Sequence, residues 1–104
     1  MSFMVIKRKQ TDNKGLFYGE QDGSIVAELS YTISSRGVMV IEHTEVNEAM
    51  RGKGYGRQLV EHAVAYARAN NFKIIPYCPF AKAISGKTPE WQDVIYHPGG
   101  TSSE

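Results

Sequence analysis

Residues 51–67, RGKGYGRQLVEHAVAYA, join a glycine-rich turn to a helical pattern. Three glycines, Gly52, Gly54 and Gly56, alternate there with a lysine and a tyrosine. A glycine within a helix costs about 0.5–1 kcal/mol relative to alanine, so glycines clustered at a helix entrance need a specific reason. A glycine-rich turn at a helix N-terminus offers unblocked backbone N–H groups and the positive end of the helix dipole. The stretch therefore predicts either an anion-binding loop or a corner that glycine eases sterically.

The residues after the turn follow the period of an α-helix. The apolar side chains that share one arc at about 100° per residue are Leu59, Val60, Ala63, Val64 and Ala67. Arg57, Glu61 and Arg68 lie on the opposite arc, which indicates an amphipathic helix with one buried face. Asn70 and Asn71 suit the end of this helix.

Strand patterns flank the helix on both sides. Residues 38–46 have an apolar first half, which predicts a strand buried on both faces. Residues 73–78, KIIPYC, predict a second strand. A strand, a helix and a strand in succession favour parallel neighbours joined by a right-handed crossover. Pro76 cannot donate to a strand ladder, so it predicts an edge or a disrupted pairing.

The N-terminal part predicts three further strands. Residues 3–9 and 16–19 flank a turn at 11–15, and residues 25–33 alternate apolar and polar side chains as in a half-buried strand. The short connections favour an antiparallel meander. After the last strand we expect a short helix near residues 80–85, a segment at 91–96 and a loose tail at 98–104. The expected fold is α/β (α+β), with a single domain at residues 1–97.

The composition limits the classes of function. Twelve lysines and arginines against eleven acidic residues give a net charge of +1, which argues against a nucleic-acid binder that acts through bulk charge. One cysteine and three scattered histidines exclude an internal disulfide and a typical zinc site. No stretch approaches the ~20 apolar residues of a spanning helix, and no secretory signal is evident. We therefore expect a cytoplasmic protein without metal, nucleic-acid or membrane partners, as a monomer or weak dimer.

Two common nucleotide motifs do not fit the glycine turn. The dinucleotide fingerprint G-x-G-x-x-G places Arg57 or Leu59 where it needs its third glycine. The P-loop needs a glycine–lysine–serine/threonine run that this chain lacks. The spacing that remains is R-x-x-G-x-G, formed by Arg51, Gly54 and Gly56 between a strand and an amphipathic helix.

This spacing and its surroundings resemble a known family. The stretch EHTEVNEAMRGKGYGRQLVEHAVAYA, residues 42–67, is similar to the acyl-CoA-binding core of the GNAT acetyltransferase superfamily. The motif H-T-x-V…R-G-x-G-x-G, followed by PYCPFAK at residues 76–82, is similar to the sequence of the minimal N-acetyltransferase-like proteins, which have roughly one hundred residues. The resemblance is strong over residues 42–82 and extends to PEWQDV, residues 89–94. Larger members place helices between the first two strands, where this chain has only TDNKG, so its acceptor half looks reduced.

The resemblance implies a coenzyme A site. In this superfamily the backbone amides of the turn hold the pyrophosphate of coenzyme A, and the pantetheine arm enters between splayed fourth and fifth strands. By match to the motif, Val46 borders the pantetheine arm. The pyrophosphate loop comprises Arg51, Gly52, Lys53, Gly54, Tyr55, Gly56 and Arg57.

Three side chains are candidates for the acyl chemistry. Counted along its strand, His43 shares a side with Met39 and Ile41 and could act as a general base, or simply bond to the backbone. Cys78, on one side of its strand with Ile74 and Pro76, could be an acyl-accepting nucleophile activated by His43, or a small buried hydrophobe. Glu42 could act as a base through a water, or be a solvated carboxylate.

The combined prediction is an acetyl-CoA-dependent N-acyltransferase. It would transfer an acetyl group to an amine of unknown identity, by direct attack or through an acyl-cysteine. A non-catalytic module that binds coenzyme A or acyl-CoA is the alternative, and a protein-interaction domain with a purely structural glycine turn is the third. Acetyl-CoA would be a cosubstrate, and no metal is expected.

Overall fold

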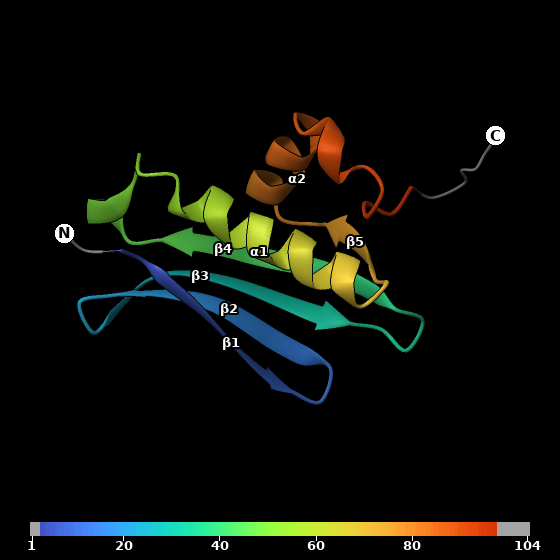
Figure 1. Cartoon of the computed structure of the whole chain (residues 1–104), viewed down its shortest axis with the longest axis horizontal. Helices are drawn as coiled ribbons and strands as arrows, with labels where there is room; N and C mark the ends of the chain where they lie inside the picture. Colours follow the sequence, from blue (N-terminus) through green and yellow to red (C-terminus); the bar gives the residue numbers. More distant parts are fainter. Residues whose placement is uncertain (1–2, 98–104) are drawn as a thin grey trace.

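Five strands lie side by side in the order of the chain and form one sheet, and two helices pack on one face of this sheet (Figure 1). The computed structural model describes residues 3–97. The strands are β1 (Val5–Thr11), β2 (Lys14–Gln21), β3 (Ser24–Ile33), β4 (Val38–Val46) and β5 (Lys73–Pro76). The helices are α1 (Tyr55–Ala69) and α2 (Pro79–Gly86), with short 3₁₀ turns η1 (Glu48–Met50) and η2 (Pro89–Trp91).

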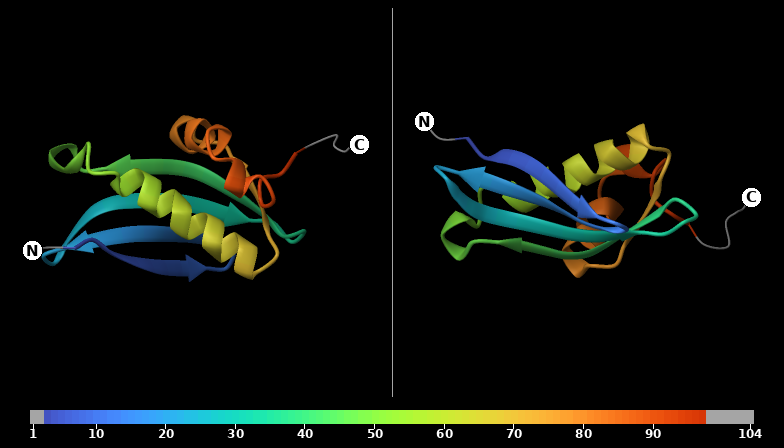
Figure 2. Two further views of the ribbon diagram at one scale, coloured as in Figure 1. Left: turned by 45° about the horizontal axis from the view of Figure 1, so that its top comes forward. Right: turned by 90° about the horizontal axis from the view of Figure 1, so that it is seen from below.

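The sheet confirms the predicted topology. Strands β1 to β4 form an antiparallel meander, and β5 pairs with β4 in parallel after the crossover through α1. Figure 2 shows α1 lying diagonally across the sheet, where it packs against β2, β3, β4 and β5. No helix of residues 3–97 covers the opposite face, which we call the uncovered face (Figure 2, right).

The core lies between α1 and the sheet. The predicted apolar arc of α1 is buried in full, together with Gly56. Opposite it, Leu29, Met39 and Ile41 are completely buried, and Tyr31 is nearly so. Full burial of one such aliphatic side chain contributes about 1.5–3 kcal/mol, so this layer supplies most of the drive to fold.

Several boundaries differ from the sequence prediction. The first strand spans Val5–Thr11 and not residues 3–9. The second is longer than predicted, Lys14–Gln21, because the two strands pair without a break from Val5 with Glu20 to Thr11 with Lys14. The last strand ends at Pro76, two residues early. The prediction that β4 is buried on both faces is wrong: Val38 and Val40 are only half-buried, because no helix covers their side. The predicted tail at residues 98–104 lies outside the described residues, so the domain boundary at 97 stays a prediction.

A β-bulge changes which way the second half of β4 faces. Ser30 pairs with His43, but the next residue of β3, Tyr31, pairs with Ile41. Glu42 is therefore an extra residue on β4, and side chains beyond it change faces relative to simple alternation. Because paired residues share a face, Thr44 joins the core side opposite Leu29.

Strands β4 and β5 part after four residue pairs. The last pair is Ile41 with Pro76, and the Ile41 carbonyl accepts the N–H groups of both Tyr77 and Cys78, each at 3.1 Å. Pro76 is the last residue of β5. Its missing N–H would point away from β4, since the N–H of Ile74, two residues earlier, donates to Val94. The prediction that Pro76 marks an edge or a disrupted pairing is confirmed, because it lies on the edge strand β5 where pairing with β4 ends.

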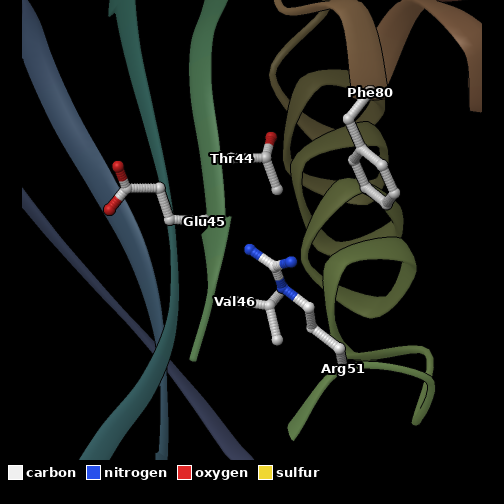
Figure 3. Close-up of a pocket in the computed structure, with 5 residues that line it drawn as sticks. All are labelled: Thr44, Glu45, Val46, Arg51 and Phe80. Atoms are coloured by element: carbon white, nitrogen blue, oxygen red, sulfur yellow. The ribbon is translucent and has the colours of Figure 1, made fainter. Parts of the chain in front are cut away.

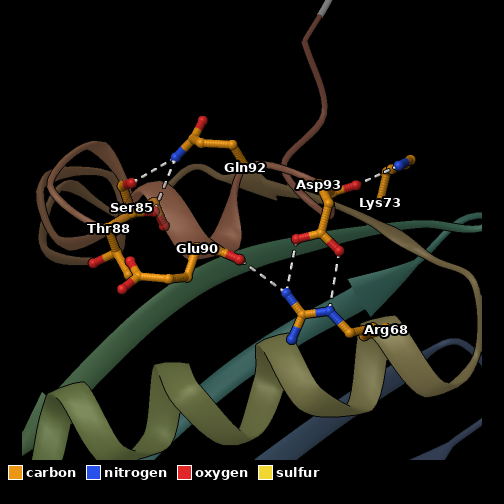
Figure 4. A network of polar contacts seen from close by, with 7 residues as sticks. All are labelled: Arg68, Lys73, Ser85, Thr88, Glu90, Gln92 and Asp93. Carbon is orange, nitrogen blue, oxygen red and sulfur yellow. Dashed lines mark hydrogen bonds and ion pairs between the residues drawn. The ribbon is translucent and has the colours of Figure 1, made fainter.

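The C-terminal segment is tied back to α1 and β5. Ile95 forms a parallel bridge with Ile74. The Arg68 guanidinium makes two hydrogen bonds to the Asp93 carboxylate, at 2.7 and 3.0 Å, and one to the Glu90 carbonyl (Figure 4). The hydrogen bonds from Arg68 hold the pKa of Asp93 below its ordinary value.

We predict that Arg68→Gln raises the pKa of Asp93, as measured by NMR titration of its carboxyl group. A carboxylate with a lowered folded-state pKa stabilises the protein above its unfolded pKa, and this contribution disappears as the pH falls through the folded pKa. Wild type should therefore lose more stability than Arg68→Gln on acidification, as measured by urea unfolding. Arg36→Gln, at an exposed turn arginine, is the control. Equal Asp93 titration in wild type and Arg68→Gln would contradict the assignment.

Candidate active site

The parting of β4 and β5 opens a cavity of about 500 Å³, which we call the β4–β5 gap. It is lined by Thr44, Glu45, Val46, Arg51 and Phe80. Figure 3 shows Thr44 and Val46 on the strand facing Phe80 of α2, with the Arg51 guanidinium between them and Glu45 turned to the other side of β4. The volume is within the roughly 300–1,000 Å³ typical of small-molecule sites.

The glycine turn stands at one end of the gap. Gly52 and Gly54 have φ angles of 86° and 78°, a conformation that other residues rarely adopt. Gly54 is the N-cap of α1 and makes no side-chain cap hydrogen bond, so no side chain blocks the first N–H groups of the helix. A hollow of about 240 Å³ beside the turn shares Val46 and Phe80 with the gap. The gap thus leads directly to a helix N-terminus suited to anions.

Gly56 is present for a different reason. The helix begins at Tyr55, so Gly56 lies in its first turn rather than in the loop. A Cβ at Gly56 would lie 2.7 Å from the ring of Phe80 and 3.5 Å from Val46. The glycine therefore lets α2 approach the start of α1 and sets the width of the gap at this end.

Cationic side chains near the turn are arranged unequally. Arg51 reaches into the gap, and no acidic side chain of the described residues forms an ion pair with it. The guanidinium of Arg57 lies 5.3 Å from the centre of the Trp91 ring and 3.4 Å from Glu61. Arg51 is thus free to meet a ligand, whereas Arg57 is already engaged by its neighbours.

Cys78 is the N-cap of α2 and contacts Thr44, one of the residues that line the gap. Its side chain is buried, and its Sγ donates a hydrogen bond of 3.5 Å to Oγ1 of Thr44. Burial raises the pKa of the thiol, but hydrogen bonding lowers it: the Thr44 hydroxyl can donate to the sulfur once the thiol proton has left, and the backbone of Ala81 and Phe80 also bonds to the sulfur. The net pKa lies below the ordinary 9.0. The thiol can therefore ionise more easily than its burial alone would allow.

Comparison with known proteins identifies the family of this chain. The family model described as GCN5-related N-acetyl-transferase matches residues 16–94. A GCN5-like protein from Staphylococcus aureus, whose solution structure is known, is 34% identical, with a TM-score of 0.65, over 92% of this chain and 96% of its own. The chain belongs to the GCN5-related N-acetyltransferase family.

More distant solved structures share the fold. An IAA acetyltransferase from Bacillus cereus is 20% identical with a TM-score of 0.61, and the match covers 69% of this chain and 63% of that protein. A Bacillus anthracis protein solved with acetyl coenzyme A is also 20% identical, with a TM-score of 0.55, over 62% of this chain and 38% of that protein. This chain thus spans less than two thirds of these larger relatives. No curated protein matches it.

The predicted family, fold class and enzyme class are therefore confirmed. Among the described residues no group of three or more His, Cys, Asp or Glu side chains is placed to hold a metal ion. Within the same residues no helix is long and apolar enough to cross a bilayer.

The prediction that His43 shares a side with Met39 and Ile41 is wrong, so the geometry on which its activation of Cys78 depended is absent. Because the bulge at Glu42 interrupts the alternation, His43 does not share a side with Met39 and Ile41, but lies on the uncovered face opposite Ser30. Cys78 is not on a strand beside Ile74 and Pro76, since β5 ends before it. Glu42 accepts a hydrogen bond from Thr32 at 3.4 Å, also on the uncovered face.

His43 has a small hollow of its own. This hollow of about 210 Å³ is lined by Leu16, Glu28, Ser30, His43 and Glu45. The candidate site of this family member is therefore divided by β4, with Thr44 and Cys78 on the gap side and His43 and Glu42 on the other.

Three residues that line the gap, Thr44, Glu45 and Phe80, were not predicted from the sequence. Thr44 belongs to the H-T-x-V motif. Strict alternation places it on the opposite side of the strand from His43, but it does not show that this is the side that Cys78 contacts. Phe80 is in PYCPFAK and fills the space that the absent Cβ of Gly56 leaves. The available signal for Phe80 was that one motif contains a glycine, Gly56, and the other an aromatic residue that can pack against it. The bulge at Glu42 leaves no signal in a single sequence.

We predict that Thr44→Val raises the pKa of Cys78, because the thiolate loses a hydrogen-bond donor. Ultraviolet absorbance of the thiolate during a pH titration measures this directly, since Cys78 is the single cysteine. Thr44→Ser keeps a hydroxyl and should titrate nearly as wild type. Thr32→Val, on the uncovered face, should also leave the titration unchanged. A Thr44→Val curve that overlays wild type would refute the contact.

Proposed function

We propose that this protein transfers the acetyl group of acetyl-CoA to an amine, with the coenzyme held in the β4–β5 gap. The observation that carries this proposal is the parting of β4 and β5 at Ile41 and Pro76, beside the glycine-capped start of α1. A gap of this kind accepts a long, thin ligand with an anion at one end. Acetyl-CoA has that shape, and family membership supports its choice.

The pyrophosphate would bind at the glycine turn. Backbone N–H groups of residues 52–56 and the positive end of α1 favour a negative charge there. Arg51 can add a charge-assisted hydrogen bond, since no acidic side chain of the described residues competes for it. Lys53 and Tyr55 belong to the predicted loop as well, whereas Arg57 would need to leave Trp91 to take part.

The pantetheine arm would lie along the free edge of β4. Beyond Ile41, β4 has no strand partner on the side of β5, so its edge has N–H and C=O groups available to an extended chain that carries amides. Val46 and Phe80 supply apolar walls on either side. The thioester would then lie near Thr44, at the inner end of the gap.

We propose direct attack by the amine as the chemical route. The amine nitrogen forms a bond to the thioester carbonyl, the carbon–sulfur bond breaks, and the coenzyme leaves as a thiol after taking up a proton. An acceptor that approaches from the uncovered face would meet His43 or Glu42, either of which can accept the proton that the amine loses. Glu28 and Glu45 beside His43 favour a cationic amine at that hollow.

The acyl-cysteine route receives less support from the geometry. Its first step would form a bond between Cys78 Sγ and the acetyl carbon, with release of the coenzyme thiol, before the amine displaces the cysteine. Cys78 has a lowered pKa, but its side chain is only 5% exposed and His43 is not its neighbour. The separation of His43 from Cys78 also supports the second candidate function, a module that binds acyl-CoA without turnover.

We predict that Gly54→Asp weakens coenzyme A binding at least tenfold, because a carboxylate would stand where the pyrophosphate binds. Isothermal titration calorimetry with coenzyme A measures the effect. Gly23→Asp is a matched control: Gly23 has a φ of 81° against 78° for Gly54, and both would place a Cβ in open space. The two variants should lose similar stability, while only Gly54→Asp loses affinity. Equal affinity of both variants would show that the coenzyme does not bind at this turn.

We also predict that His43→Gln lowers the rate of acetyl transfer roughly 10²-fold or more, as expected for loss of a general base. His62→Gln, at an exposed histidine of α1, should act as wild type. Cys78→Ala should keep most of the rate, and mass spectrometry should detect no acetyl adduct on the wild-type enzyme. Transfer is measured against a panel of amines with acetyl-CoA. An adduct at Cys78, together with an inactive Cys78→Ala variant, would establish the acyl-cysteine route instead.

A further inference from the structure

A second cavity lies on the other side of α2 from the β4–β5 gap. It has a volume of about 450 Å³ and is bounded by β5, α2 and the segment that follows η2. We call it the α2–β5 cavity. We propose that it binds a small carboxylate with an aromatic or branched apolar body, independently of acetyl transfer.

The walls of this cavity are mainly apolar. Ile75 and Pro76 end β5 and Tyr77 follows it, while Ile95 and Tyr96 come from the C-terminal segment. The side chains of Tyr77 and Tyr96 are 75% and 42% exposed. A pocket with aliphatic and aromatic walls gains most from a flat or branched apolar ligand.

A buried hydroxyl without a partner lies at this cavity. Ser85 is 3% exposed, and its Oγ makes no hydrogen bond with the described residues. Its own carbonyl is satisfied by Nε2 of Gln92 at 2.8 Å (Figure 4). Thr88, just beyond the end of α2, donates its hydroxyl to the Ile84 carbonyl at 2.8 Å. A hydroxyl in this region can therefore bond to a backbone carbonyl of the helix, which the Ser85 hydroxyl does not do. A buried hydroxyl left unpaired is costly, and a ligand acceptor would remove that cost. The Oγ itself is screened from solvent, so a side chain of the cavity wall must move for a ligand to reach it.

The charge at the cavity favours an anion. Lys82 and Ser85 are three residues apart on α2, so their side chains are neighbours on one face of the helix. No ion pair within residues 3–97 involves Lys82, and none of the nine lining residues is acidic. A carboxylate can accept from both groups. A cationic amine would find no counter-charge, which distinguishes this cavity from the proposed acceptor side at His43.

The backbone around the cavity disfavours a peptide strand as its occupant. The N–H and C=O groups of Ile74 on the outer edge of β5 are already bonded to Val94 and Tyr96. Pro76, the next outward-facing residue of β5, has no N–H to donate. Strand addition needs a row of free backbone groups, so a small molecule suits the site better than an added strand.

The test uses phenylacetate as the probe, with the full chain and NMR detection of its amide signals. We expect saturable shifts at Lys82, Ser85 and Gln92. Phenethylamine, which has the same ring but a cationic group, should cause none of these shifts. The absence of saturation with phenylacetate, or equal shifts with phenethylamine, would overturn the proposal. Sedimentation at several protein concentrations should show no self-association; dilution-dependent association lost in Tyr77→Ser would instead assign this surface to a second copy of the chain.

Two variants separate binding from folding. Ser85→Ala should leave the free protein as stable as wild type or more stable, because the lost hydroxyl has no partner, yet weaken phenylacetate binding at least fivefold. Lys82→Met should weaken binding similarly, whereas Lys87→Met, just beyond α2 and outside the cavity, should not. Coenzyme A affinity should be unchanged in Ser85→Ala and Lys82→Met. If Ser85→Ala destabilises the free protein or binds the probe as wild type does, the hydroxyl is structural and the proposal fails.

Discussion

The carbonyl of Ile41 accepts two N–H groups from the chain that follows β5, and this interaction determines where β4 and β5 separate. Tyr77 and Cys78 both donate to it, so the chain leaves the sheet there instead of pairing with Glu42. Pro76 is compatible with this exit, because its missing N–H would point away from β4 and toward the outer edge of β5. Everything assigned to the coenzyme depends on this departure. Without it, residues 42–46 would have a paired edge and the gap would not exist.

The bulge at Glu42 acts on the same strand at the same place. It turns Thr44 toward Cys78 and places His43 on the uncovered face, so β4 separates the proposed coenzyme site from His43 and the carboxylates of its hollow, Glu28 and Glu45. Direct attack needs the amine nitrogen and the thioester carbon in contact, so an acceptor that arrives from the uncovered face must reach past the unpaired edge of β4 that borders the gap.

Much of this structure was accessible from the sequence because the informative signals are local. Each of three signals depends on only a few neighbouring residues: the apolar arc of α1, the turn residues of the meander and the glycines at the start of α1. The structure confirms the helix, the meander and the glycine turn that these signals predicted. The bulge was not accessible, since it arises from the register of β3 against β4 and leaves no mark on the alternation of β4 alone. The end of β5 was misplaced for a related reason: Tyr77 and Cys78 have strand propensity, but their N–H groups converge on one carbonyl. The contact of Phe80 with Gly56 joins two motifs that sequence analysis treated separately.

Coenzyme A is proposed to lie in the β4–β5 gap with its pyrophosphate on the glycine turn. A crystal structure of the protein grown with saturating coenzyme A decides whether it does. We expect pyrophosphate oxygens within hydrogen-bond distance of the backbone N–H groups of residues 52–56, and a pantetheine arm along β4 from Val46 toward Thr44. A coenzyme bound at any other surface, or a glycine turn that stays empty under those conditions, would contradict it.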